Sequence, residues 1–168
     1  MQDLKVELTE DADFVHSILT HPDIFYDVTS EDYREKFGEN LKDFIKEDMP
    51  NHIYFKVQYK EDIAGMIGFH EFSPGVLQGH MNMLKSFRGE VALEVAKICQ
   101  NIIFNKTQYE KILAMVPSKF GAVFHFLVKL GFKLECMYTN KYKDKGNFYD
   151  VYVFSLTKEG VKDYGGVQ

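Results

Sequence analysis

The residues Ser86–Phe104 read SFRGEVALEVAKICQNIIF, in which an Arg-Gly pair leads directly into a helical repeat. Apolar side chains recur there at helical spacing, at Val91, Val95, Ile98, Cys99, Ile102 and Ile103. This spacing predicts a helix from Glu90 to about Asn105 that buries one stripe of its surface. Arg88 and Gly89 stand immediately before it, and a cation with a glycine at a helix N-terminus is typical of an anion-binding site.

The chain before this helix begins with a predicted strand and two predicted helices. Alternating apolar residues indicate a strand over Asp3–Thr9, and the helix that follows is broken at Pro22. A second helix ends before Pro50, because a residue that precedes proline avoids helical geometry. The candidate capping residues are Thr9 or Asp11 for the first helix and Thr29 or Ser30 for the second. The apolar face of the second helix is predicted to contain Tyr33, Phe37, Leu41, Phe44 and Ile45.

Three stretches with a period of two come next and predict an antiparallel meander: NHIYFKVQYK, IAGMIGFHEF and VLQGHMNML. After the central helix, Tyr109–Val116 forms a short apolar strand, and a strand–helix–strand crossover favours parallel pairing. A further helix, capped by Ser118, ends at Gly131, and a hairpin closes the chain. The order β-α-α-β-β-β-α-β-α-β-β predicts a single mixed α/β domain over residues 1–168.

Composition and charge argue against several classes of partner. The net charge is −5 and the pI about 5.7, which disfavours a broad electrostatic grip on nucleic acid or on an anionic membrane. No leader and no apolar run of about 18 residues is visible, so we expect a cytoplasmic protein. Cys99 and Cys136 are the two cysteines, and both are expected to be buried thiols.

This order of elements, with RG before the central helix and KLGF closing the last one, resembles the GNAT N-acetyltransferase superfamily. The motif match extends from about His80 to Phe132 and is most similar to the small GNAT proteins that bacteriophages encode. The resemblance implies a mixed central sheet with helices on both faces. That sheet would combine the antiparallel meander with a splayed parallel pair formed by His80–Leu84 and Ile112–Val116.

The resemblance also implies that acetyl-CoA is the co-substrate. Its pantetheine would extend the sheet beside Met81–Leu84, and its pyrophosphate would meet the amides of Arg88–Ala92. The implied cofactor-binding residues are Met81, Met83, Leu84, Arg88, Gly89, Glu90, Val91, Ala92, Phe120 and Phe124. Several positions depart from the family pattern. Aligned on Arg88, the chain has Val91 and Leu93 where the phosphate loop usually has small residues; aligned on Ala92, it has Phe87 and Glu90 at the arginine and first glycine positions. Phe120 stands in place of an asparagine, and Leu127 in place of a tyrosine that can protonate the thiolate. Arg88 could alternatively pair with Glu90 or Glu94.

His80 is the candidate catalytic base, since it lies on the implied cofactor strand and an imidazole suits proton removal near neutrality. A structural or surface histidine is the alternative. His70 and Glu71 could line the acceptor side, or could be ordinary solvated residues at a strand end. The remaining histidines are scattered, and no pair has the spacing of metal ligands, so no metal is expected.

The sequence therefore predicts an N-acetyltransferase that moves an acetyl group from acetyl-CoA to an unidentified primary amine in a ternary complex. Phe25, Tyr26, Tyr33, Asp27 and Asp32 would form an aromatic and acidic acceptor wall. The competing hypothesis is a non-catalytic interaction or assembly module of the same fold, possibly viral. The protein would be a monomer or a homodimer, in the host cytoplasm if a phage encodes it.

Overall fold

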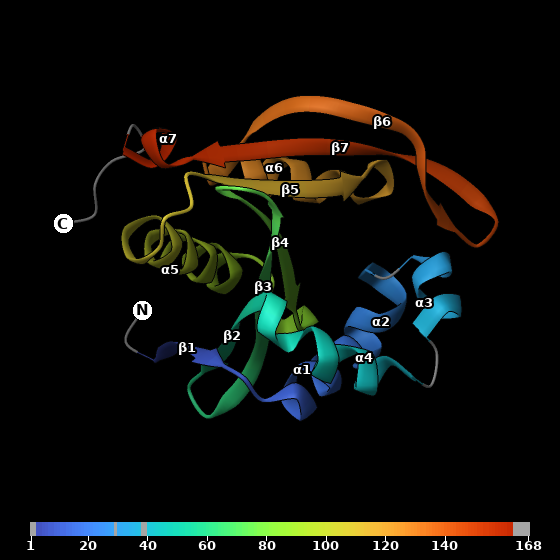
Figure 1. Ribbon diagram of the computed structural model, residues 1–168, viewed down its shortest axis with the longest axis horizontal. Coiled ribbons are helices and arrows are strands. Elements are labelled where there is room, and N and C mark those ends of the chain that lie inside the picture. The colour runs from blue at the N-terminus through green and yellow to red at the C-terminus, as the bar shows by residue number, and fades with distance from the viewer. Residues whose placement is uncertain (1–2, 29, 38–39, 163–168) are drawn as a thin grey trace. The chain divides into compact units, whose positions relative to one another are not determined.

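A computed structural model describes residues 3–28, 30–37 and 40–162 (Figure 1). The strands are β1 (Leu4–Thr9), β2 (His52–Tyr59), β3 (Asp62–Ser73), β4 (Val76–Met83), β5 (Lys111–Pro117), β6 (Lys133–Asp144) and β7 (Asn147–Thr157). The α-helices are α1 (Ala12–Leu19), α2 (Pro22–Val28), α3 (Glu31–Phe37), α4 (Leu41–Asp48), α5 (Glu90–Lys106), α6 (Gly121–Lys129) and α7 (Lys158–Lys162). Short 3₁₀ turns are η2 (Met49–Asn51), η3 (Lys85–Phe87) and η4 (Ser118–Phe120).

The seven strands form one mixed sheet in the order β1-β2-β3-β4-β5-β7-β6. Only β4 and β5 run parallel, and their ladder pairs Val76–Gln78 with Lys111–Leu113. The other neighbouring strands are antiparallel. The predicted α/β fold, with its meander and its parallel pair, is thereby confirmed.

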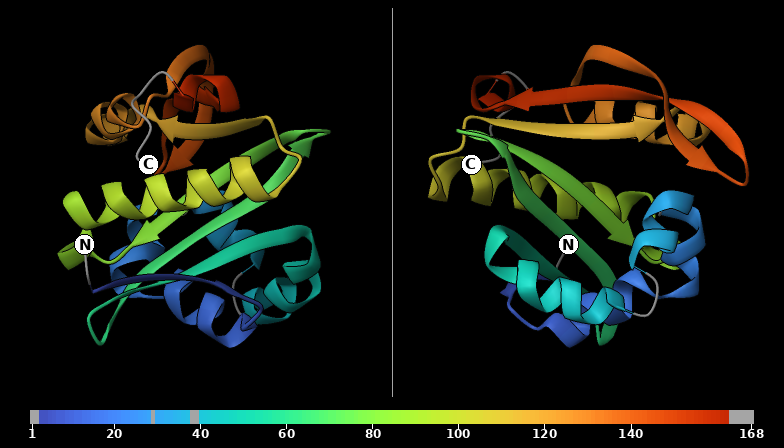
Figure 2. Two further views of the ribbon diagram at one scale, coloured as in Figure 1. Left: turned by 90° about the vertical axis from the view of Figure 1, so that its left-hand side faces the viewer. Right: turned by 45° about the vertical axis from the view of Figure 1, so that its right-hand side comes forward.

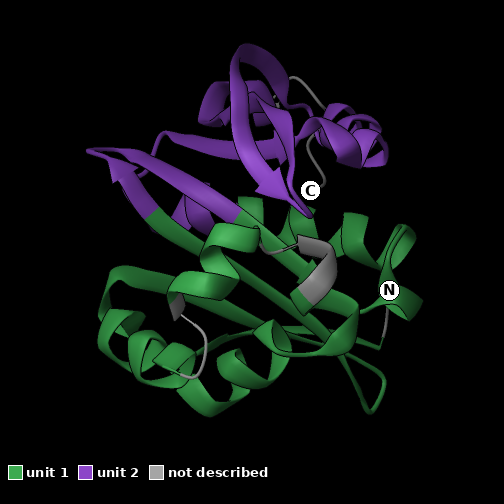
Figure 3. Cartoon of the chain, turned by 90° about the vertical axis from the view of Figure 1, so that its right-hand side faces the viewer, with its two compact units in different colours: residues 1–70, 80–100 green, residues 71–79, 101–168 purple. Residues whose placement is uncertain are grey.

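The chain divides into two compact units (Figure 3). Unit 1 comprises residues 1–70 and 80–100, and unit 2 comprises residues 71–79 and 101–168. Both β3 and β4 pass from one unit into the other, as does α5. The expectation of a single domain over residues 1–168 stays a prediction.

Unit 1 is built on β1–β3 and the second half of β4, with α5 on one face and α1, α2 and α4 on the other (Figure 2). Asp11 caps α1 by accepting a hydrogen bond from the Phe14 amide at 2.9 Å, as expected for an N-cap aspartate. The core on the α1 face is formed by Val15, Ile18, Ile24, Leu41, Ile45 and Met66. Because side chains alternate along a strand, the residues of β3 that share this face with Met66 include His70.

Unit 2 contains β5, β7 and β6 with α6. The C-terminus of α6 has the predicted left-handed glycine: Gly131 has a φ of +87°, and the Phe132 amide donates to the Leu127 carbonyl at 3.0 Å. β6 is the edge strand of the sheet, and most of its residues are exposed. No helix in the described part of the chain is both long enough and apolar enough to cross a lipid bilayer.

Four local predictions need correction. The first helix, α1, ends before Pro22 as predicted, but Pro22 begins a further helix, α2, that the sequence did not predict, because proline is well tolerated in the first turn of a helix. The predicted helix that ends before Pro50 is two helices, α3 and α4. Ser118 does not cap α6, since η4 intervenes and no side chain caps that helix. Cys136 is exposed, because it lies on the edge strand, whereas Cys99 is buried as predicted. Of the two proposed caps for α3, Ser30 accepts from the Tyr33 amide at 3.1 Å, and Thr29 lies outside the described residues.

Candidate active site

The turn that joins β4 to α5 has the shape of an anion-binding loop. After η3 the backbone is extended at Arg88, and Gly89 takes a φ of +100°, which side-chain-bearing residues rarely adopt. The Gly89 carbonyl accepts the first α5 hydrogen bond from the Leu93 amide at 2.9 Å. A Cβ added at Gly89 would meet no atom within 4 Å, so the space beside this glycine is open.

The first amides of α5 have no acceptor within the helix. In any α-helix the first N–H groups precede the first possible carbonyl partner, and here these are the amides of Gly89, Glu90, Val91 and Ala92. None of the described residues provides a backbone or side-chain acceptor for them. They lie at the positive end of the helix dipole and form a set of donors suited to a phosphate group.

Arg88 braces this loop against the start of α2. Its guanidinium donates to the Met83 carbonyl at 3.1 Å through Nε and to the Asp23 carbonyl at 2.8 Å through Nη2. The Asp23 carboxylate in turn accepts a hydrogen bond from the Lys85 amide at 3.0 Å. This hydrogen bond is the largest cause of the lowered pKa of Asp23. The predicted pairing of Arg88 with Glu90 or Glu94 is not among the contacts of the described residues, and the guanidinium instead holds the loop in shape.

The backbone of β4 presents alternate residues to its two sides. The Leu84 amide donates to the Ala64 carbonyl at 3.0 Å, so Leu84 and Asn82 direct their backbone groups toward β3. β3 approaches closely here, because a Cβ on Gly65 would lie 2.3 Å from the Asn82 carbonyl oxygen. Met81 and Met83 therefore point their amides to the opposite side. The Leu84 amide is thus already bonded, whereas the Met83 amide points away from β3.

Three histidines from neighbouring strands come together on one face of unit 1. His52 and His70 are register partners in β2 and β3, and their ring centroids lie 5.2 Å apart with the ring planes tilted by 45°. His70 and His80 are stacked with centroids 5.1 Å apart and ring planes 13° from parallel. We call His52, His70 and His80 the histidine column. From the sequence, His80 and His70 were predicted as separate candidates, and His52 was grouped with the scattered histidines.

Two rings of the column, His70 and His80, have lowered pKa values. Desolvation, followed by the nearby rings of His70 and His52, lowers the pKa of His80 to about 4. The side chain retains an exposed face, so this desolvation comes from protein packed around the ring and not from full enclosure. Desolvation also lowers the pKa of His70, with a further lowering by His52 and an opposing effect of Asp48. At pH 7 His80 is a neutral imidazole with one free lone pair.

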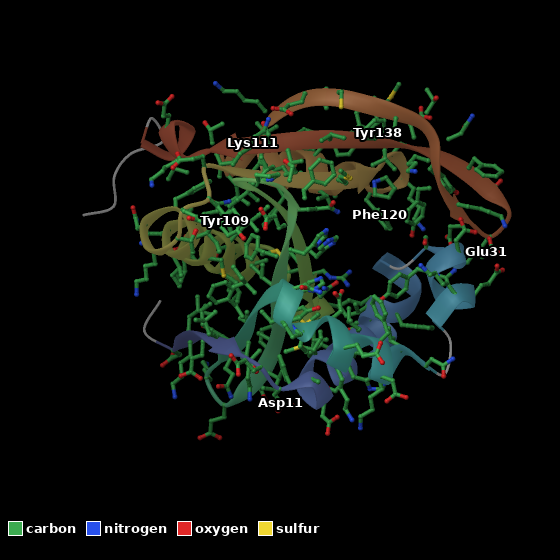
Figure 4. The ribbon with its side chains drawn as sticks, viewed as in Figure 1. Asp11, Glu31, Tyr109, Lys111, Phe120 and Tyr138 are labelled. Carbon is green, nitrogen blue, oxygen red and sulfur yellow. The ribbon has the colours of Figure 1, made fainter. Side chains whose placement is uncertain are left out.

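Unit 2 holds the other two predicted cofactor residues. Phe120 lies where β5 gives way to α6 (Figure 4), and the Phe124 ring packs 4.9 Å from the Tyr152 ring. Lys119 stands beside Phe120 and forms a 2.8 Å ion pair with Asp144, over the rings of Phe120, Tyr142 and Tyr149. Leu127 is buried with 6% exposure, in agreement with an apolar packing role.

The other predicted acceptor-side residues differ in burial. Glu71 and Asp32 are exposed, whereas Phe25 and Tyr33 pack against the α1-face core. The side chains of Tyr26, Asp27 and Phe37 lie outside the described residues. Across the described ranges, no group of three or more His, Cys, Asp or Glu side chains is arranged to hold a metal ion.

Solved acetyltransferase structures share this fold over almost the whole chain. A spermidine N-acetyltransferase SpeG chimera from Vibrio cholerae and hSSAT superposes with a TM-score of 0.79, at 13% identity, over 96% of this chain and 99% of that one. The spermidine/spermine N-acetyltransferase SpeG from Vibrio cholerae gives 0.76, at 14% identity and 98% of both chains. A probable acetyltransferase gives 0.72, at 14% identity and 95% of both chains. At these identities the likeness concerns the fold.

The sequence itself assigns the family. Residues 4–153 match the acetyltransferase (GNAT) domain, which is most of the chain. The protein therefore belongs to the GNAT acetyltransferase family, as the order of its elements predicted. No curated protein sequence gives a significant match.

Proposed function

We propose that this protein transfers the acetyl group of acetyl-CoA to a primary amine. The observation that carries the proposal is the turn before α5, where the amides of Gly89–Ala92 have no acceptor among the described residues and face open space beside Gly89. These amides would bind the pyrophosphate, and Arg88 would hold the loop in the required shape. Membership of the GNAT family supports acetyl-CoA as the donor.

The β4 backbone would hold the reactive end of the donor. The backbone of Met81 would pair with the pantetheine in the manner of an added strand, because the Met83 carbonyl already accepts a hydrogen bond from Arg88. The Met83 amide would then donate to the thioester oxygen and stabilise the negative charge that develops on it. Phe120 and Phe124 belong to unit 2, and their predicted contacts with the cofactor stay predictions.

The reaction would proceed by direct attack. The amine nitrogen forms a bond to the acetyl carbon, the C–S bond breaks, and His80 accepts the proton that the nitrogen loses, directly or through water. A low pKa makes His80 a weaker base than an ordinary histidine, but it also passes the proton readily to water. Leu127 cannot donate a proton, so the coenzyme A thiol leaves as a thiolate, which its pKa of about 8.5 permits.

Spermidine is the first acceptor to test, because two of the structural neighbours are named as spermidine N-acetyltransferases. The experiment measures thiol release from acetyl-CoA with spermidine, free lysine and a short peptide as acceptors, with His80→Ala as the comparison. Release that depends on an amine and falls at least tenfold in the variant supports the proposal. Failure of acetyl-CoA both to bind and to react would refute it. A bacteriophage source and a cytoplasmic location stay predictions.

The competing assembly-module hypothesis also has an observation in its favour. β6 is an edge strand, and large apolar side chains are exposed on it and on β7: Leu134, Met137, Tyr138 and Phe148, at 44–61% exposure. Exposed apolar groups on an unpaired edge are typical of an association surface. The molar mass in solution separates the predicted alternatives of a monomer and a homodimer.

A further inference from the structure

At the His52 end of the histidine column, the ring of Tyr54 stacks on the ring of His52. The Tyr54 ring lies 5.1 Å from the His52 ring and only 5° from parallel to it. Tyr54 faces Gly68 across the β2–β3 ladder, and a Cβ on Gly68 would come within 2.8 Å of the Tyr54 ring. Glycine at this position therefore provides the space in which the tyrosine lies flat, and the stack begins from a fixed surface.

The same end of the column is anchored to α4. The Nδ1 atom of His52 lies 3.1 Å from the carbonyl oxygen of Asp48 and 3.4 Å from its carboxylate oxygen Oδ2. These contacts fix the plane of the His52 ring. At the other end of the column His80 is exposed, so only its stacking contact with His70 is available from the column to orient it.

His70 is the middle ring of the histidine column, and its Nδ1 atom makes no hydrogen bond within the described residues. That atom is buried. A buried polar atom without a partner is unfavourable, so hydrogen bonding at this atom does not explain a histidine here. The His70 ring instead contacts a ring on each side: its centroid lies 5.2 Å from that of His52 and 5.1 Å from that of His80.

We propose that His70 is a positioning residue for His80: it fixes the plane of the His80 ring by stacking on it, while its own ring contacts the anchored ring of His52 at a 45° tilt. This inference rests on the proposed function, in which His80 accepts the proton of the acceptor amine. Among the described residues of unit 1, the titratable groups that act on the column are His52 and Tyr54 of β2, Asp48 of α4 and Tyr33 of α3. Burial, Tyr33 and Asp48 raise the pKa of Tyr54 to about 12, so this phenol stays neutral in the working pH range.

Two substitutions at His70 separate ring stacking from other roles. His70→Phe keeps a flat ring and removes the unpartnered nitrogen, whereas His70→Ala removes the ring. We expect His70→Ala to lower kcat at pH 8 by about ten- to a hundredfold with an unchanged KM for acetyl-CoA, because a misplaced catalytic group loses rate and not donor affinity. His70→Phe should keep kcat within about threefold of the parent. His125→Ala, which changes an exposed histidine on α6, is the control and should match the parent.

The pH profile gives a readout that a purely structural role would not move. Both His70 variants remove a neighbour that lowers the pKa of His80, so the acid limb of the rate should move to higher pH in both. Parent-like kcat and an unmoved acid limb in His70→Ala would overturn the proposal, as would a His70→Phe variant as slow as His70→Ala.

NMR of the His80 ring protons distinguishes this failure from failure of the proposed function. In a parent protein without transfer activity the proposed function fails, yet the ring signal still reports the stack. We expect His70→Ala to shift the His80 ring signals and to raise their titration midpoint, because the adjacent ring current and charge are lost. Unchanged His80 signals would overturn the positioning role whatever the activity.

Discussion

Replacing Gly89 by alanine tests whether the loop before α5 binds the phosphates of acetyl-CoA. A methyl group at Gly89 would clash with nothing, since no atom lies within 4 Å of its position. The cost comes from the backbone, because alanine at a φ of +100° is strained by about 1–3 kcal/mol. For a chain of this size that corresponds to a fall in Tm of about 2–4 °C for each kcal/mol.

Gly89→Ala should also weaken the binding of acetyl-CoA, in addition to lowering the stability of the protein. Relief of the strained φ would turn the amides of Gly89–Ala92 away from their common direction, and loss of one hydrogen bond to a charged phosphate costs about 1.5–3 kcal/mol. The Kd for acetyl-CoA, measured by titration calorimetry, should therefore rise by about 10- to 150-fold.

Two other glycines provide matched controls. Gly75 has a φ of +78° with open space around it, so Gly75→Ala should cost similar stability and leave acetyl-CoA binding unchanged. Gly121 also has open space but a helical φ of −53°, so Gly121→Ala should be neutral or stabilising by about 0.4–1 kcal/mol. If Gly89→Ala and Gly75→Ala bind acetyl-CoA equally well, the assignment of the phosphates to this loop is wrong.

Three further predictions concern stability, each measured by thermal or denaturant unfolding. Gly65→Ala should lose about 3 kcal/mol or more, because its Cβ would lie 2.3 Å from the Asn82 carbonyl oxygen at a strained φ of +146°; an unchanged Tm would refute that close approach of β3 and β4. Lys119→Met should lose up to about 3 kcal/mol, because it removes the 2.8 Å ion pair with the buried Asp144 carboxylate and the cation beside the rings of Phe120 and Tyr142; an unchanged Tm would contradict this. The pKa of His80 is lower in the folded state than in the unfolded state, so the contribution of His80 to stability is constant above about pH 6.5 and becomes unfavourable as the pH falls toward about 4. His80→Gln should therefore flatten the decline in Tm over that pH interval. An identical decline in both proteins would show that His80 does not contribute.

The sequence predicted most of the fold because its elements carry strong local signals. The alternation of β2 and the glycine that ends α6 appear in the structure where the pattern indicated. The buried stripe of α5 also appears, except that Ile98, predicted to belong to it, is 37% exposed. The errors arise where tertiary placement decides the outcome. Cys136 is exposed because β6 lies at the edge of the sheet. The helix predicted before Pro50 is divided into α3 and α4, although its apolar residues follow one continuous helical spacing.

The partners of Arg88 illustrate a limit of local reasoning. The sequence offered Glu90 and Glu94 as neighbours, but the guanidinium bonds to the carbonyl of Asp23, which lies 65 residues earlier in the chain. A backbone carbonyl leaves no mark in the residue types, so the pattern at the helix start could indicate a positive charge there but not what that charge contacts.

The histidine column was partly readable from the hairpins. His52 and His70 each lie nine residues from Glu61 in the first turn, and His70 and His80 each lie five residues from Gly75 in the second (61 − 52 = 70 − 61; 75 − 70 = 80 − 75). Such symmetry brings residues opposite one another in a meander.

The exact register also depends on a β-bulge, which the residue types alone do not locate. The ladder begins with Tyr59 opposite Asp62, and without a shift it would place His52 opposite Phe69, on the other face of β3. The shift beside Val57, where Gly65 takes a φ of +146°, moves the pairing by one residue and aligns His52 with His70.

The most direct test of the account is an NMR titration of ¹⁵N-labelled protein with acetyl-CoA, with the backbone amides assigned. We expect saturable shifts that are largest at the amides of Gly89–Ala92 and Met83, since these are the groups proposed to bind the pyrophosphate and the thioester oxygen. The amide of Leu84, already bonded to Ala64, should move less. Saturable binding that leaves the amides of Gly89–Ala92 unmoved, or no binding at millimolar acetyl-CoA, would contradict the central claim.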